Sequence, residues 1–477
     1  MVRSLAGGRR GVRHGQGGCD GRRPRMHPNR QRRLPGDRGM AGSHADFGTT
    51  GIRRLRRRPV QWRQRVQLQE RPVPTCRDHL GSSRHPMNKT LRTQRGFTLV
   101  ELMISLVLGL LIILALLTML INVNRNNSEL SSTNRLIENG RFAVQLLSSD
   151  VAHAGYWSGH VPEFDNLTGS TTVGPTDVPT AVPDPCQAFA AWDAAYKTNL
   201  IGMAVQGTDI LDVSSPSAPV CAGVVTNPQR NTDLLVVRHA EPCLVGSGTD
   251  DCSDTRAATS PHVYVQASRC GDDTTTLVLG TTGFTLKAGD CTADAPIRRF
   301  SSSIYYVRDH ANAAGDGIPT LMRARFGVNG TPQFLSAQAL VEGVQGFRVE
   351  YGVDNRSDTA ATVDLAALAL PIAWPTGATV LNTPTNRGNG LPDEYIRCSQ
   401  ATPCTADQLV NVTVVKLYVL VRAERTTPGH TDTKQYCLAS SCTNPTDYMG
   451  PFNDGYKRHL FTQTIRLTNV ATRRETP

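Results

Sequence analysis

The sequence lacks the short motifs that mark the active sites of common enzyme classes. It contains no G-x-S-x-G elbow, no H-E-x-x-H zinc motif, no P-loop and no G-x-G-x-x-G dinucleotide motif. It also lacks a C-x-x-C pair, and histidine is sparse near its cysteines, which disfavours a zinc site. We therefore expect no catalytic residue, no metal and no cofactor, and we expect that the protein is not an enzyme.

Two groups of acidic residues are the remaining candidates for a cation site. Asp250, Asp251 and Asp254 form one group, and Asp354 and Asp358 form the other. Neither group matches the spacing of an EF-hand calcium loop. We expect these residues to occupy solvated turns rather than to bind calcium.

Residues 1–86 lack both lysine and any regular apolar pattern. They hold 21 arginines against five acidic residues, and their apolar residues follow neither a helical nor a strand period. We expect this segment to be a disordered upstream extension that is not native, with translation beginning at Met87. Beyond residue 96 the balance reverses to 27 basic against 35 acidic residues, so we expect no nucleic-acid partner for the remainder.

Charge is absent from residues 102–121, of which 14 are Leu, Ile or Val. Twenty such residues are enough to cross a bilayer as one helix. Their insertion free energy sums to about −4 to −8 kcal/mol. Glu101 stands at the start of this run, and a charge at a helix centre would cost about 3 kcal/mol. The sequence therefore predicts a transmembrane helix that inserts despite Glu101.

A short basic leader, residues 87–96, precedes the apolar run. A secretory signal places its small-residue cleavage site after the apolar run, whereas Gly96 lies before it. The unbroken G-F-T-L-V-E of residues 96–101 resembles the signal of type IV prepilins. The resemblance implies that a prepilin peptidase cleaves between Gly96 and Phe97, that Phe97 is then N-methylated, and that Glu101 takes part in assembly.

No proline interrupts residues 97–155, which predicts one helix of roughly 85 Å. Residues 97–123 would be its transmembrane half and residues 124–155 an amphipathic half. Apolar residues in the second half recur three and four positions apart: Leu136, Gly140, Ala143 or Val144, Leu147, Val151 and Ala154. This stripe predicts that the helix packs on a globular head.

The head, residues 156–477, reads as strands joined by turns and long loops. We expect strands at residues 233–237, 262–266, 275–279, 304–307, 321–325, 344–353, 412–421 and 459–467. No helical repeat separates them, so the sheet should be antiparallel. Residues 158–230 read as long loops with a few short elements, and residues 354–403 as an insertion.

Ten cysteines follow the apolar run, an even number in a head that the basic leader would orient outside the cytoplasm. That combination predicts disulfides, whose connectivity the sequence does not fix. Local closure favours four pairs, Cys243–Cys252, Cys270–Cys291, Cys398–Cys404 and Cys437–Cys442, which leaves Cys186–Cys221 as the fifth.

Residues 138–157, 340–354 and 458–469 resemble PilW-type minor pilins. The resemblance implies an α+β, pilin-like fold, with the long helix packed on an antiparallel head that has disulfide-bonded loops. It also implies a structural subunit that crosses the inner membrane once, with its head in the periplasm, and then enters or primes a pilus. Its partners would be prepilin peptidase and other major and minor pilins. A minor pseudopilin of a type II secretion system and a membrane-anchored periplasmic enzyme are the alternatives.

Overall fold

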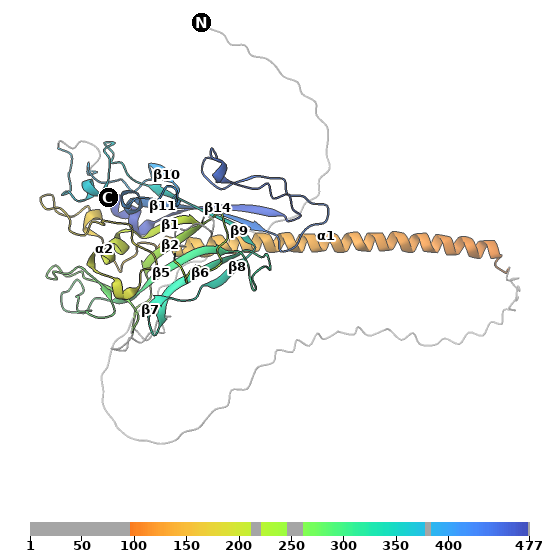
Figure 1. Ribbon diagram of the computed structural model, residues 1–477, viewed down its shortest axis with the longest axis horizontal. Helices are drawn as coiled ribbons and strands as arrows, with labels where there is room; N and C mark the ends of the chain where they lie inside the picture. The colour runs from red at the N-terminus through yellow and green to blue at the C-terminus, as the bar shows by residue number, and fades with distance from the viewer. Residues whose placement is uncertain (1–95, 211–220, 246–260, 377–382, 476–477) are drawn as a thin grey trace, which may run out of the picture. The chain divides into compact units, whose positions relative to one another are not determined.

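The computed structural model describes residues 96–210, 221–245, 261–376 and 383–475. Contacts divide the chain into residues 1–94 and residues 95–477, and every described residue belongs to the second unit. Figure 1 shows this unit as one long helix, α1, with strands gathered around its second half.

Helix α1 (Leu99–His153) runs for 55 residues without a break. Every large apolar side chain from Leu99 to Val123 is at least 43 % exposed. Among the described residues, α1 is the one helix that is long and apolar enough to cross a membrane. The continuous helix predicted for residues 97–155 is confirmed to within two residues at each end.

The second half of α1 packs on the head through one face. Its buried residues repeat at the predicted spacing: Leu136, Gly140, Ala143, Leu147 and Val151. They join a core with alternate residues of β11 (Val412–Arg422), among them Leu417 and Val419. A Cβ atom at Gly140 would lie 2.0 Å from the ring of Phe461 on β14 (Arg458–Arg466), so glycine allows a close approach there.

The sheet beneath α1 has four antiparallel strands in the order β10 (Glu394–Ile396), β9 (Val344–Val353), β11 and β14. Residues of β11 alternate between its two faces. The face away from α1 places Tyr418 and Leu420 against Leu438, next to the hairpin of β12 (Tyr436–Cys437) and β13 (Tyr448–Met449). The two central strands, β9 and β11, are therefore buried on both faces, whereas the edge strands β10 and β14 are partly exposed.

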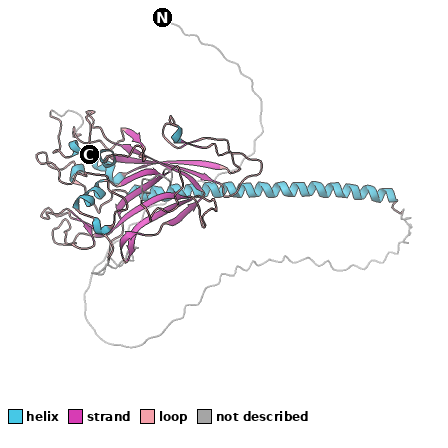
Figure 2. Cartoon of the chain, in the orientation of Figure 1, coloured by secondary structure: helices cyan, strands magenta, loops and turns pink. Residues whose placement is uncertain are grey.

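A second, eight-stranded sheet is built around β5 (Ile297–Arg308), which pairs antiparallel with three strands. Its other strands are β1 (Val205–Ile210), β2 (Thr232–Ala240), β3 (Tyr264–Ala267), β4 (Leu277–Gly280), β6 (Thr320–Asn329), β7 (Thr331–Phe334) and β8 (Gln338–Glu342). The short helices are α2 (Ala194–Gly202), α3 (Leu365–Leu368), α4 (Ala406–Val410) and α5 (Thr468–Arg474), with 3-10 turns at Glu163–Asp165, Phe189–Ala191 and Pro445–Asp447. Figure 2 colours the strands apart from these helices.

The α+β class and the antiparallel pairing are confirmed, and all eight expected strands are present. Strand β5 begins at Ile297, seven residues before the expected position. The early part reads Ile297-Arg-Arg-Phe-Ser-Ser-Ser303, and its serines are at most 4 % exposed although they are polar. Backbone pairing on both sides, and not an apolar pattern, makes this segment a strand.

Candidate processing and assembly site

The predicted cleavage site lies in an open stretch just before α1. Phe97 is 85 % exposed. Nothing lies within 4 Å of the position that a Cβ atom on Gly96 would occupy. A larger side chain at this position would therefore meet no steric clash within the chain. A requirement for glycine here must come from a partner that binds the segment.

Glu101 forms a capping box with Thr98, the residue that precedes α1. The Thr98 N–H donates to Glu101 Oε2 at 3.0 Å, and the Glu101 N–H donates to Thr98 Oγ1 at 3.3 Å. The Thr98 hydroxyl also donates to Glu101 Oε2, at 3.0 Å. Two backbone donors that a helix start leaves unsatisfied thus find acceptors. The spacing of Thr98 and Glu101 in T-L-V-E is typical of a capping box, which the sequence analysis above did not predict.

An ion pair fastens the end of α1 to the eight-stranded sheet. Asp150 of α1 accepts from His239 Nε2 of β2 at 3.0 Å and from the Tyr305 hydroxyl of β5 at 2.8 Å. His239 Nδ1 lies 2.9 Å from the Ala240 carbonyl oxygen. Both ring nitrogens therefore face acceptors, which favours the protonated imidazolium. Burial lowers the pKa of His239, but the bond to Asp150 outweighs it, so that the pKa is raised overall.

Three residues form a buried ionic cluster between the two sheets. Asp233 of β2 accepts from Arg348 Nη1 of β9 at 3.0 Å and from Arg397 Nη2 at 2.7 Å. Its second oxygen accepts from the Val349 N–H at 2.9 Å. The Asp233 and Arg348 side chains are 3 % and 5 % exposed. The carboxylate thus joins a strand of one sheet to a strand of the other.

A second cluster holds the last helix, α5, in place. Arg474 lies 2.7 Å from Asp165 and 3.2 Å from Asp354. Burial raises the pKa of Asp354, and the nearby Arg474 opposes that rise. Asp354 also accepts from the backbone N–H groups of Asn389 and Gly390.

Asp354 therefore corrects one expectation from the sequence, because it is buried and ion-paired instead of lying in a solvated turn. Its companion Asp358 accepts from the side chains of Asn389 and Thr383. Both carboxylates thus face donors. The other acidic group, at residues 250–254, lies outside the described residues.

Four of the five expected disulfides are present, with Cα atoms 4.9–5.9 Å apart: Cys186–Cys221, Cys270–Cys291, Cys398–Cys404 and Cys437–Cys442. The fifth expected pair, Cys243–Cys252, involves a residue outside the described ranges.

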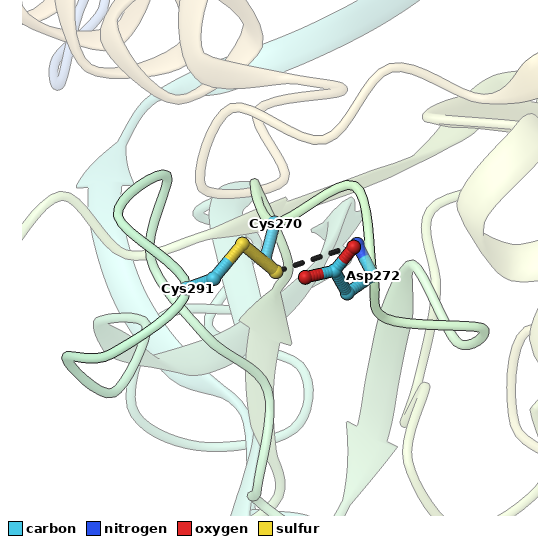
Figure 3. A group of neighbouring side chains, drawn as sticks. All are labelled: Cys270, Asp272 and Cys291. Atoms are coloured by element: carbon cyan, nitrogen blue, oxygen red, sulfur yellow. Dashed lines mark hydrogen bonds between the residues drawn. A yellow bond between two sulfur atoms is a disulfide. The ribbon is translucent and has the colours of Figure 1, made fainter.

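The sulfur atoms of Cys270 and Cys291 lie close to the carboxylate of Asp272, at a spacing that would suit a metal ion. Figure 3 shows that the two sulfurs are bonded to each other. The Asp272 N–H donates to Cys270 Sγ at 3.4 Å. Because disulfide sulfurs are not thiolates, this group lacks the ligands that zinc takes from cysteine.

A cavity of about 260 Å³ that contains titratable groups lies beside α2. Burial, followed by the charge of Arg473, lowers the pKa of its His160 to about 4. Its Asp177 accepts from the backbone N–H groups of Glu163 and Phe164 at 2.7 and 3.1 Å. Both oxygens of this carboxylate are thus engaged in holding a turn.

Comparison with known proteins gives two matches to protein families, one in the head and one at the start of the long helix. Residues 304–469, from β5 through β14, match the family described as type IV pilus-assembly protein W. Residues 91–117 match the prokaryotic N-terminal methylation motif. A type IV-like pilin from Thermus thermophilus is similar over 50 % of this chain and 80 % of that one, at 12 % identity and a TM-score of 0.20. No curated protein matches the sequence significantly.

A methylation motif at the start of a long exposed helix, followed by an antiparallel head, defines a type IV pilin-like subunit. The matches to the family of type IV pilus-assembly protein W and to the methylation motif support a minor pilin or assembly protein of the type IV pilus. Proteins of this family are generally structural. The motif and the apolar helix indicate anchoring in a membrane. The two family matches imply interaction with prepilin peptidase and with other pilins in general.

Proposed function

We propose that the protein is a minor subunit that enters or primes the pilus and has no enzymatic role. The transmembrane half of α1 would hold it in the inner membrane with its head in the periplasm. The observation that carries this proposal is the position of the exposed apolar half of α1, directly after the G-F-T-L-V-E signal. Such a surface can be buried either in lipid or among the helices of a filament.

Prepilin peptidase would cleave between Gly96 and Phe97 before assembly. The enzyme must fit the residue before the scissile bond close to the membrane surface, where a side chain has little room. The open surroundings of Gly96 in the chain support this reading, because the glycine has no internal role there. Gly96→Val should therefore leave an unprocessed precursor, and a mature mass from that variant would contradict the assignment.

Cleavage would create a cation next to the capping box. The amino group of Phe97 is positively charged near neutral pH and lies four residues before Glu101. In a filament of packed helices, Glu101 of one subunit would pair with the terminus of its neighbour and set the axial register. The capping box supplies the competing explanation, because helix capping by itself could account for the acid.

Two substitutions separate charge from capping. Glutamine also serves at the third position of a capping box, so Glu101→Gln keeps the cap and removes the charge. Thr98→Ala removes the cap and keeps the charge, at a cost of about 1 kcal/mol of helix stability. We expect both variants to be inserted and processed, with Glu101→Gln depleted from pili.

The measurement is the ratio of each variant to the major pilin in sheared filaments, with the mature mass as a check on processing. Normal incorporation of Glu101→Gln together with loss of Thr98→Ala would reverse the conclusion. The acid would then act through the helix start alone.

A further inference from the structure

A groove of about 270 Å³ lies where α1 leaves its apolar segment and meets the loop after β11. The helix lines it with Arg125, Ser132 and Arg135 among others, and the loop lines it with Glu424 and Arg425. Neither the expected processing nor the expected helix packing makes use of this groove.

The helix sets the depth of the groove relative to a bilayer. At 1.5 Å per residue, the apolar side chains from Leu99 to Val123 span about 36 Å. The hydrocarbon core of a bilayer is about 30 Å thick. Arg125, two residues beyond Val123, would therefore lie at the level of the lipid headgroups. This step rests on the membrane anchoring proposed above.

Among the described residues, two arginines that line the groove remain unpaired once its internal ion pairs are formed. Arg135 and Glu424 lie 3.0 Å apart, and Lys457 lies 3.4 Å from Glu129, so both acids that line the groove already face a cation. In the described part of the chain, Arg125 and Arg425 make no hydrogen bond or ion pair. Two guanidinium groups are thus left to bind an anion.

Hydroxyl groups add neutral donors to these cations. Ser128, Ser131, Thr426 and Thr427 line the same groove. The Ser132 Oγ atom is buried and has no hydrogen-bond partner among the described residues. A buried hydroxyl without a partner costs free energy, so a ligand that accepts its hydrogen bond would be favoured.

We propose that this groove binds the phosphate of an anionic phospholipid in the leaflet next to the head. Guanidinium groups and hydroxyls together suit a phosphate, which accepts several charge-assisted hydrogen bonds. Free inorganic phosphate has the same chemistry. A lipid is favoured because the helix fixes the groove at headgroup depth, where lipid phosphates are concentrated. The contact would hold the base of the head on the membrane and would be released when the subunit is extracted into a filament.

The test uses the full chain in nanodiscs of phosphatidylcholine with a minor share of phosphatidylglycerol. Native mass spectrometry counts the lipids that remain bound when the disc is removed. The variant is Arg125→Gln with Arg425→Gln. The control is Arg141→Gln, which removes an exposed arginine from the same helix, about 24 Å further from the membrane. We expect wild type and control to prefer phosphatidylglycerol, and the double variant to lose about 25-fold in that preference, or about fivefold for each arginine.

Equal retention of the two lipids by wild type would overturn the proposal, as would an unchanged preference in the double variant. A second arm adds inorganic phosphate to protein in discs of phosphatidylcholine alone. Phosphate binding that needs both arginines, without any preference for phosphatidylglycerol, would assign the groove to a soluble anion instead. The readout requires membrane insertion only, so absence of the protein from pili would contradict the pilus proposal and leave this one standing.

Discussion

Replacing Asp233 by asparagine should remove the charge that the buried Arg348 shares with the partly buried Arg397. The change keeps the size of the side chain but leaves the Arg348 guanidinium, 5 % exposed, without the carboxylate that lies 3.0 Å away. Arg397 is less affected, because Asp209 remains 3.9 Å from it. Removing one partner of a buried ion pair costs about 3 to 5 kcal/mol. The asparagine oxygen still accepts one bond, so we expect a loss of about 3 kcal/mol, at the lower end of that range.

The assay is chemical denaturation of the full chain, with the loss read as a lower midpoint at an unchanged slope. Asp294→Asn is the matched control, because Asp294 also has an ion pair, 2.7 Å from Lys287, but is 75 % exposed. An exposed pair of this kind is worth less than about 1 kcal/mol. Equal losses in the two variants would refute the reasoning that burial, and not the ion pair as such, makes Asp233 important.

Three further predictions concern the helix, the pH response and the cysteines. Gly140→Ala places a methyl group against the ring of Phe461 and should destabilise the fold by about 1 to 3 kcal/mol; in a Phe461→Ala background the same change should stabilise it by about 1 kcal/mol, and an unchanged sign would contradict the packing. The pKa of His239 is raised in the fold from an ordinary value of 6.5, so the advantage of wild type over His239→Gln should be complete below pH 6.5 and shrink as the pH rises through the folded pKa. Denaturation midpoints of both proteins at several pH values check this, and an advantage that grows with pH would refute it. Alkylation without reduction should add no mass to the folded head, whereas labelling of two or more cysteines would refute full pairing.

The elements predicted best from the sequence are those with a strong apolar period. The stripe from Leu136 to Val151 has helical spacing, and the same residues are buried against the sheet. Strand β9 (Val344–Val353) has the predicted bounds, because alternation is clear there and the strand lies at the centre of its sheet. Local pattern and tertiary burial agree in both cases.

The ionic clusters could not be predicted, because their members are far apart in the chain. Asp233 and Arg348 are 115 positions apart, and Asp165 and Arg474 are 309 apart. A sequence shows that each residue is charged, but the fold alone shows which partner it meets. Asp354 illustrates the resulting error, since its neighbours in sequence suggest a solvated turn, whereas it is buried and paired with Arg474.

The candidate site was predictable in part. The G-F-T-L-V-E signal indicates the segment from Gly96 to Glu101, but it does not by itself indicate the hydrogen bonds of the acid. Its capping bond to Thr98 follows from a spacing of three residues that is visible in the sequence. The groove near Arg125 and Arg425 could not be predicted from the sequence, because these two arginines lie 300 positions apart in the chain.

The central claim is that a processed form of this chain becomes part of a pilus. The most direct test is mass spectrometry of the native protein from sheared pili and, separately, from membranes. We predict that the protein from pili begins at N-methylated Phe97 and carries no peptide from residues 1–96. Recovery of the protein from membranes alone, or with an intact bond between Gly96 and Phe97 in the filaments, would contradict this account.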